Sequence, residues 1–337
     1  MSKLVSISFP AVQNLSTLMP FKRAGVPLIV IGKNVAESIR KEAAVVVQDI
    51  EDLVLYLEST DTQYIIHSGV SQRSSAILKD KGYKNIFLDH GTGLVDRGES
   101  GMSYYKNISP MLKDYDFFIV GSEQQKKIYE ELHTIPKLIL IENIRANEFL
   151  QKNPNKQELL RQRGLDEKKT TLVFIPTWHA PKATLENKMY PQTFMVTQED
   201  AVRSAILALK DDYNVIIRPH PNLLVHTPDL VQRMREHCNV FIDEGFDPYE
   251  CLFIGDYLIG DYSSLNYDAI YLGKNLIFVN FLRQEKKIEC FREIFHIHEL
   301  FDVLNQSFPQ GQECDIKKET YDLLTALSSK ISADFLL

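Results

Sequence analysis

Tyr257-Leu258-Ile259-Gly260-Asp261-Tyr262-Ser263-Ser264 is an apolar run followed by a glycine, an acid and two hydroxyls. Its start predicts a buried strand, and its end predicts a turn into a helix over 264–272. An earlier apolar run, Asn214-Val215-Ile216-Ile217, leads in the same way into Arg218-Pro219-His220-Pro221. Ligands of open α/β sheets bind at the carboxyl ends of the strands. Both turns are therefore expected at a ligand site.

The chemistry of these two turns suits a nucleoside diphosphate. His220 has a fixed direction because it lies between two prolines, and Arg218 either structures the loop or reaches a phosphate. Ser263 and Ser264 offer hydroxyls where backbone N–H groups at a helix start attract phosphate. Asp261 belongs to the same loop, and we count it with the donor-binding residues. The alternative is that one serine only caps the helix.

Strand-like and helix-like segments alternate along the chain, which predicts α/β domains with parallel sheets built from βαβ units. The expected strands are 4–9, 27–31, 64–67, 85–88, 117–120, 137–141, 171–175, 214–217, 240–242, 257–259 and 276–279. Amphipathic stretches predict helices over 51–58, 71–81, 123–132, 198–209, 228–237, 264–272 and 317–331. Neither a dinucleotide-binding glycine fingerprint nor a P-loop is present, which disfavours those two ligand classes.

The two successive series predict two Rossmann-like domains that face each other across a cleft. The length of 337 residues accommodates both, at roughly 100–200 residues per domain. We expect an acceptor-side domain over 1–155 and a nucleotide-donor domain over 165–315. A C-terminal helix within 316–337 is expected to pack back on the first domain. Polar stretches at 153–156 and 161–169 predict the linker.

Composition narrows the class of protein. The formal net charge of −7 argues against a general nucleic-acid binder, which would show a basic excess. The four cysteines have no CxxC spacing, so we expect neither a disulfide framework nor a zinc site. No signal peptide and no run of ~18 apolar residues is seen. We therefore expect a cytoplasmic protein.

Two further strand ends in the first half carry candidate residues. His90 follows an expected strand and precedes Gly91, which permits close backbone approach. A histidine there suits a general base, since its ordinary pKa is near neutrality; the alternative is a histidine that caps a turn. Ser122 begins a helix, where plain capping is the favoured interpretation. The other interpretation is contact with an acceptor phosphate.

The second half adds two more candidates. Thr177 follows the strand over 171–175 and is expected to donate to a phosphate. Asp268 lies four residues after Ser264, on the same face of the expected helix. An acid there suits ribose hydroxyls, whereas it would repel phosphate. The alternative is an acid on the surface of that helix.

Taken together, these motifs resemble those of the CDP-glycerol glycerophosphotransferases, the teichoic-acid primases and polymerases. The resemblance rests on four segments in the family's order: Leu88-Asp89-His90-Gly91-Thr92, Ile175-Pro176-Thr177-Trp178, Arg218-Pro219-His220-Pro221, and Gly260-Asp261-Tyr262-Ser263-Ser264 with Asp268. It implies a GT-B-like fold. It also implies transfer of an alditol phosphate, glycerol phosphate first of all, from CDP-glycerol or another CDP-alditol to an acceptor hydroxyl, with release of CMP.

In the mechanism that the resemblance implies, His90 takes the proton of the acceptor hydroxyl. His220 stabilises charge on the diphosphate together with Thr177, Ser263 and Ser264. The expected acceptor is a glycan or a lipid-linked molecule in teichoic-acid or capsule synthesis, with peripheral association at the inner face of the membrane. No cofactor and no metal ligand are required, and Mg²⁺ with the diphosphate is left open.

The motifs leave two alternative functions open. A GT-B glycosyltransferase that uses a nucleotide sugar would share the fold, because function lies in the site rather than in the fold. A degenerate, non-enzymatic relative would bind a nucleotide or a partner enzyme without turnover.

Overall fold

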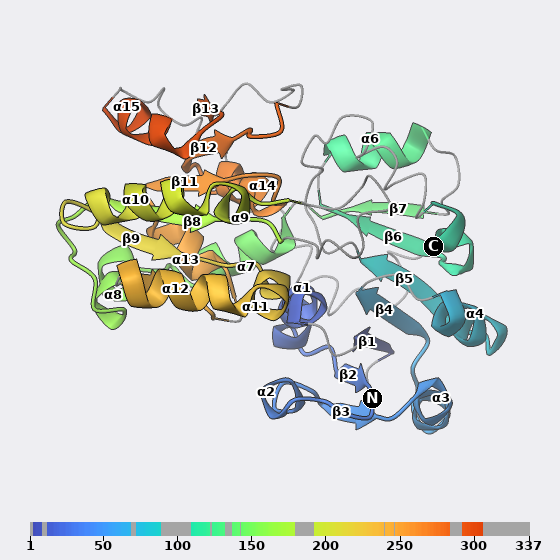
Figure 1. Cartoon of the computed structure of the whole chain (residues 1–337). Helices are drawn as coiled ribbons and strands as arrows, with labels where there is room; N and C mark the ends of the chain where they lie inside the picture. The colour runs from blue at the N-terminus through green and yellow to red at the C-terminus, as the bar shows by residue number, and fades with distance from the viewer. Residues whose placement is uncertain are drawn as a thin grey trace. The chain divides into compact units, whose positions relative to one another are not determined.

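The structure, a computed structural model, describes residues 3–8, 12–68, 72–88, 109–121, 123–131, 137–141, 143–178, 192–238, 240–245, 247–283 and 292–305. The described chain forms two compact units, of which the first ends at Glu148 and the second begins at Phe149. Each unit is built on one parallel sheet with helices packed against it (Figure 1).

Unit 1 contains a seven-stranded sheet in the order β3-β2-β1-β4-β5-β6-β7, and all neighbouring strands are parallel. Its strands are β1 (Leu4–Ser8), β2 (Leu28–Ile31), β3 (Val45–Val47), β4 (Tyr64–Ser68), β5 (Lys84–Leu88), β6 (Phe117–Val120) and β7 (Lys137–Leu140). Runs of Val, Ile, Leu and Phe suit strands that are buried on both faces. The strand order reverses between β1 and β4, which is the switch point of a doubly wound sheet.

The helices of unit 1 cover this sheet and close its core. They are α1 (Val12–Arg23), α2 (Glu37–Arg40), α3 (Ile50–Glu58), α4 (Gln72–Asp80), the 3₁₀ helix η1 (Ser109–Asp114), α6 (Glu123–Glu131) and the first part of α7 (Ile144–Gln151). In α3, Asp49 caps the first turn by accepting from Asp52 N at 3.0 Å. Leu53 and Leu57 of α3 then pack in one core with Ile29 of β2.

Unit 2 repeats the same winding with six parallel strands in the order β10-β9-β8-β11-β12-β13. The strands are β8 (Thr171–Ile175), β9 (Asn214–Ile217), β10 (Phe241–Ile242), β11 (Tyr257–Gly260), β12 (Asn275–Val279) and β13 (Arg292–Ile294). The switch point of this sheet lies between β8 and β11. Its carboxyl edge there is the expected place for a ligand.

Helices pack on the sheet of unit 2 according to the alternation of side chains along its strands. They are α8 (Lys156–Gln162), α9 (Phe194–Thr197), α10 (Glu199–Leu209), α11 (Pro221–His226), α12 (Pro228–Cys238), α13 (Tyr249–Ile254), α14 (Leu265–Tyr271), the 3₁₀ helix η3 (Ile297–Glu299) and α15 (Leu300–Leu304). Leu172 and Phe174 of β8 pack in one core with residues of α9, α10 and α12. Val173 lies between them in sequence and therefore points to the other face, where Gly255 approaches it closely.

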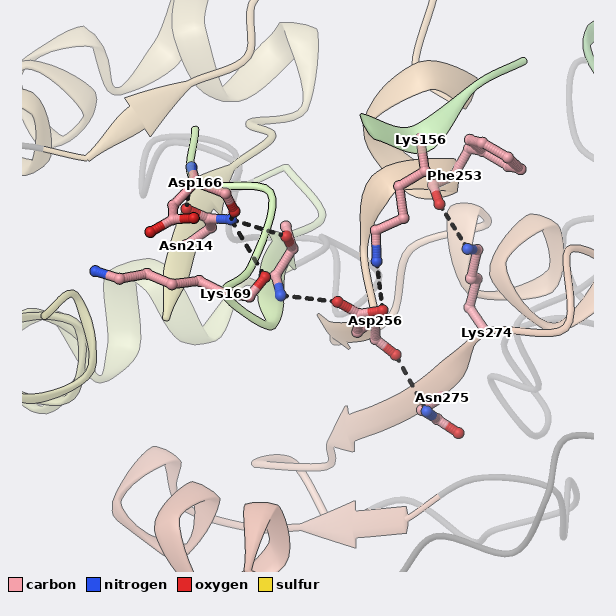
Figure 2. A network of polar contacts seen from close by, with 9 residues as sticks. Lys156, Asp166, Lys169, Asn214, Phe253, Asp256, Lys274 and Asn275 are labelled. Carbon is pink, nitrogen blue, oxygen red and sulfur yellow. Dashed lines mark hydrogen bonds and ion pairs between the residues drawn. The ribbon is translucent and has the colours of Figure 1, made fainter. Parts of the chain in front are cut away.

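The segment expected to link the domains is fastened to unit 2. Lys156 Nζ, at the start of α8, contacts Asp256 Oδ1 at 2.5 Å, and Asp256 Oδ2 accepts from Thr171 N at 2.9 Å (Figure 2). At the other end of α8, Arg163 pairs with Glu250. These contacts hold α8 at the amino edge of the sheet, opposite the switch-point edge.

Lys274 extends the same network (Figure 2). Its Nζ donates to the Phe253 carbonyl at 2.5 Å and lies 5.0 Å from the centre of the Phe253 ring. Burial, with a smaller effect from Lys156, lowers the pKa of Lys274 to about 8. The ammonium thus sits near the last turn of α13, where a cation complements the helix dipole.

The α/β fold and the expected strands are confirmed, apart from end residues and residue 9, which lies outside the described residues. Two short strands, β3 and β13, were not predicted. The helix expected over 317–331 also lies outside the described residues. No helix in the described part of the chain is long and apolar enough to cross a membrane. Cys238 and Cys251 are buried free thiols.

Candidate functional site

The predicted donor-binding residues follow three strands that are neighbours in the sheet of unit 2. Thr177 comes after β8, His220 after β9, and Asp261 directly after β11. Because β9, β8 and β11 are adjacent and parallel, their carboxyl ends share one edge. The structure therefore brings these residues to one edge of the sheet, with Thr177 and Asp261 at the switch point of unit 2 and His220 beside it.

The first turn of α11 fixes the ring of His220. Its Nδ1 accepts a hydrogen bond from Asn222 N at 3.1 Å, so the side chain caps the helix. Since Nδ1 is the acceptor, the proton of the neutral ring is on Nε2. His220 can therefore donate from Nε2, and its ring is only half-buried. The family resemblance implies that His220 stabilises charge on a diphosphate, and a hydrogen-bond donor at Nε2 suits that role.

The two serines after β11 differ in their roles. Ser263 is buried, and its Oγ accepts from Leu265 N at 3.3 Å, which is a local capping contact. Ser264 occupies the cap position of α14 but makes no side-chain cap hydrogen bond, and it is half-buried. Capping therefore accounts for Ser263, whereas it does not account for the hydroxyl of Ser264.

Asp261 points into the protein. It is 0% exposed, and its carboxylate accepts from Thr177 N at 2.7 Å and from Phe194 N at 3.2 Å. Burial raises the pKa of Asp261 to about 6, against the opposing effect of its hydrogen bonds. The side chain thus joins the turn after β11 to the turn after β8 and to the start of α9.

Arg218 is engaged in a buried ion pair. Its Nη1 contacts Asp243 Oδ2 at 3.0 Å, and both side chains are nearly inaccessible. Asp243 Oδ1 also accepts from Gly245 N at 3.2 Å. Burial first, and then the negative charge of Asp243, raise the pKa of the nearby Cys251 thiol. Of the two interpretations of Arg218, the geometry favours the one in which it structures the loop.

Burial excludes one of the two interpretations of Asp268. Its side chain is 0% exposed on α14, so it is not a surface acid, and the contact with ribose hydroxyls stays a prediction. Asn266, which sequence reasoning missed, lies on the same helix and donates from Nδ2 to the Asp261 carbonyl. A Cβ on Gly260 would overlap Asn266 Oδ1, which is why β11 ends in glycine.

Tyr262 organises the neighbouring turn after β12. Its buried hydroxyl donates to Asn280 Oδ1 at 2.8 Å and accepts from Leu282 N at 3.0 Å. Burial raises the pKa of Tyr262, which keeps the hydroxyl protonated. Asn280 Nδ2 donates in turn to Glu293 Oε1. The tyrosine between Asp261 and Ser263 therefore fixes backbone geometry at the same edge.

Comparison with protein families gives a match over most of the chain. The sequence model of CDP-Glycerol:Poly(glycerophosphate) glycerophosphotransferase matches residues 23–283. The chain belongs to this family. The family predicted from the four motifs is thereby confirmed, and so is the prediction of an enzyme, a transferase of the glycerophosphotransferase type.

Solved structures share the fold of this glycerophosphotransferase. A variant of the wall teichoic acid polymerase TagF is 14% identical, with a TM-score of 0.63 over 98% of this chain and 90% of that chain. A putative UDP-N-acetylglucosamine 2-epimerase from Listeria monocytogenes is 12% identical, with a TM-score of 0.62 over 100% and 99%.

The epimerase from Neisseria meningitidis bound to UDP-GlcNAc is also 12% identical, with a TM-score of 0.62 over 97% and 98%. Comparison with curated proteins gives no match. At these identities the structural likeness establishes the fold, and the family match carries the function.

Three predicted residues lie outside the described part of the chain: His90, Gly91 and Ser122. Their assignments to the acceptor side stay predictions. Trp178 is described, and its half-buried ring lies 6.2 Å from that of His226 on α11. Among the described residues, no group of three His, Cys, Asp or Glu side chains is arranged to hold a metal ion.

Proposed function

We propose that this protein transfers glycerol phosphate from CDP-glycerol to an acceptor hydroxyl and releases CMP. The observation that supports the proposal is that segments 218–221 and 260–264 both follow strands of one parallel sheet, so they lie at the same edge, with the ring proton of neutral His220 on Nε2. In support, the polymerase TagF, which has the same fold, has also been studied after soaking with CDPG.

In the proposed reaction, the acceptor oxygen attacks the β-phosphorus of CDP-glycerol. A new P–O bond forms to the acceptor, and the bond from the β-phosphorus to the bridging oxygen breaks. The electron pair leaves with CMP, where His220 Nε2–H stabilises the developing charge with Ser264 and Thr177. Such transfers depend mainly on positioning and charge stabilisation.

On the acceptor side, we keep His90 as the group that takes the proton of the attacking hydroxyl. The acceptor that fits a poly(glycerophosphate) family is a glycan or lipid-linked chain with a terminal hydroxyl. Such a chain would bring the enzyme to the inner face of the membrane. We keep the expectation that no metal ion is required, and CMP release in EDTA tests it against Mg²⁺ bound with the diphosphate.

Donor choice is the first test. The protein is incubated with CDP-glycerol, or with UDP-GlcNAc, together with a short glycerol phosphate acceptor, and release of CMP or UDP is measured. CMP release from CDP-glycerol alone is the expected result. Turnover of UDP-GlcNAc would favour the nucleotide-sugar alternative, which the fold of the two epimerases supports. Binding without turnover would favour a non-enzymatic relative.

His220 offers a matched pair of variants. Asparagine is a good helix cap, so His220→Asn retains an acceptor for Asn222 N while it removes the imidazole. His220→Ala removes both. We expect both variants to lower kcat by ~10²–10³, the usual effect of losing one preorganised donor. His220→Asn should also keep the wild-type melting temperature. Wild-type turnover in His220→Asn would rule out the role of the imidazole.

A further inference from the structure

Asp261 was expected to contact the donor, yet its carboxylate is used inside the protein. No part of the residue is exposed. One oxygen accepts from Thr177 N and the other from Phe194 N, at 2.7 Å and 3.2 Å. The Thr193 side chain makes a further hydrogen bond to the same carboxylate. Three segments that are distant in sequence therefore meet at one buried acid.

The backbone of Asp261 is tied as well. Its carbonyl accepts from Asn266 Nδ2, so the first turn of α14 is joined to the same point. A buried carboxylate without hydrogen bonds would be costly, and here both oxygens are satisfied by N–H groups. The arrangement fixes the position of residues 177 and 178 relative to the turn after β11.

Among the described residues, few charged side chains lie on the elements that contact Asp261. Residues 176–178 and α9 carry no ionisable side chain, and α14 carries Asp268 and two tyrosines. Tyr262 is the neighbour whose pKa the charge of Asp261 helps to raise. The carboxylate is therefore held by N–H and hydroxyl donors and is sensitive to protonation near pH 6, the value to which burial raises its pKa.

We propose that Asp261 is a positioning residue for the transfer reaction: its carboxylate fastens the turn after β8, with Thr177 and Trp178, and the start of α9 at the switch point. This inference rests on the proposed function for its effect on the donor. Protonation of the carboxyl turns one oxygen into an O–H group and weakens its ability to accept. The hydrogen bonds to the turn after β8 should then weaken as the pH falls through about 6, while the carboxyl itself stays buried.

The fluorescence of Trp178 follows the turn after β8 without any ligand, because Trp178 is the only tryptophan of the chain and lies one residue after Thr177. Its emission should shift between pH 7.5 and 5 with a midpoint near 6. His226 is a competing cause, since its ring is 6.2 Å away and an imidazolium quenches tryptophan. The control is therefore His226→Gln, which should keep the shift. Asp261→Asn, an isosteric and non-titrating change, should abolish it.

Donor binding gives the second readout. Calorimetric titration with CDP-glycerol at pH 7.5 should show about tenfold weaker binding in Asp261→Asn, since one hydrogen bond is worth ~1.4 kcal/mol, a factor of ten. Between pH 7.5 and 5 the affinity should weaken further in His220→Asn but not in the double variant with Asp261→Asn. The His220→Asn background removes the titration of that imidazole from the comparison.

The outcomes are separable. A flat wild-type emission titration would overturn the proposal, as would an Asp261→Asn variant with unchanged emission and unchanged affinity. If circular dichroism shows that Asp261→Asn is unfolded, the emission titrations of the wild type and of His226→Gln still test whether the turn after β8 responds to pH near 6. If the wild type binds no CDP-glycerol, the proposed function fails, while the emission titration continues to test the role of Asp261.

Discussion

Lowering the pH below 6.5 should destabilise unit 1, because His67 is buried there as a neutral ring. The residue lies on β4, is 2% exposed, and packs edge-on against Tyr115 with ring centroids 5.1 Å apart. Burial lowers the pKa of His67 from 6.5 to about 4, although its hydrogen bond with Asn85 opposes this effect. The unfolded chain therefore binds a proton in a pH range where the folded chain does not.

The hydrogen bonds of Asn85 determine the tautomer of His67. Asn85 Nδ2 donates to the carbonyls of Ser75 and Asp114, at 2.8 Å and 3.0 Å. Its Oδ1 is thus an acceptor, and the His67 Nε2 at 2.8 Å must carry the proton. A second proton would go to Nδ1, in a buried setting that disfavours charge.

The magnitude follows from the two pKa values of His67. A shift from 6.5 to about 4, at ~1.4 kcal/mol per unit, corresponds to ~3.5 kcal/mol of stability. This contribution is fully present above pH 6.5, and it is lost as the pH falls towards 4. A loss of this size is a large part of the stability of a typical domain, which is ~5–15 kcal/mol.

Urea unfolding at pH 7, 6, 5 and 4 tests the prediction. Emission of Trp178 follows unit 2, whereas far-UV circular dichroism follows both units. The matched variant is His67→Gln, whose amide can donate to Asn85 Oδ1 but does not titrate. Relative to this variant, the wild-type unit 1 should lose ~3 kcal/mol between pH 7 and 4. Parallel losses in the two proteins would refute the reasoning.

The stability of unit 2 should change with pH in the opposite direction, because unit 2 contains a buried acid whose pKa is raised. The pKa of Asp261 is raised from 3.8 to about 6, so the folded unit binds a proton more readily than the unfolded chain. Its contribution to stability is present below pH 3.8 and is lost as the pH rises through 6. On acidification, the unfolding transitions followed by Trp178 emission and by far-UV circular dichroism should therefore move apart. A general acid denaturation would shift both in the same direction.

Two further predictions concern packing at the switch-point edge. Asp243→Asn breaks the buried pair with Arg218 and should cost ~3–5 kcal/mol in urea unfolding, whereas Glu244→Gln, at an exposed ion pair, should cost under ~1 kcal/mol. Equal effects would contradict the assignment. Gly260→Ala places a Cβ against Asn266 Oδ1 and should cost ~1–3 kcal/mol. Combining it with Asn266→Ala should cost less than the sum of the single changes; strict additivity would show that the two residues do not interfere.

Sequence periodicity was sufficient for the fold where strands are long and apolar. The runs at β8, β9 and β11 are rich in Val, Ile and Leu and are bounded by polar turns, so both the strands and their ends can be predicted from sequence. β13 escaped prediction because Arg292–Ile294 is a three-residue edge strand with polar residues. β3 is apolar but equally short, and among the described strands it pairs with β2 alone. Such strands depend on a neighbour that local sequence does not reveal.

The candidate site could be located from sequence, but the direction of its side chains could not. Strand-end positions placed Thr177, His220 and Ser264 at one edge, because parallel strands share their carboxyl side. That Arg218 pairs with Asp243, and that Asp261 accepts from backbone N–H groups of two other segments, depends on residues far away in the chain. Side-chain partners of this kind are set by tertiary packing.

Enzymes of different chemistry share this fold at nearly equal TM-scores, so the winding of the sheets leaves the reaction open. The distinction lies in which groups stand at the switch point of unit 2. A group transfer to an acceptor hydroxyl needs donors that meet charge as it develops on the leaving phosphate, and these donors must be fixed beforehand. In the proposed reaction His220 is such a donor, and its helix-capping contact with Asn222 N fixes the ring. The buried Asp261, Asn266 and Tyr262 fix the turns after β8, β11 and β12 at the same edge of the sheet, so much of what the motif encodes is rigidity rather than ligand contact.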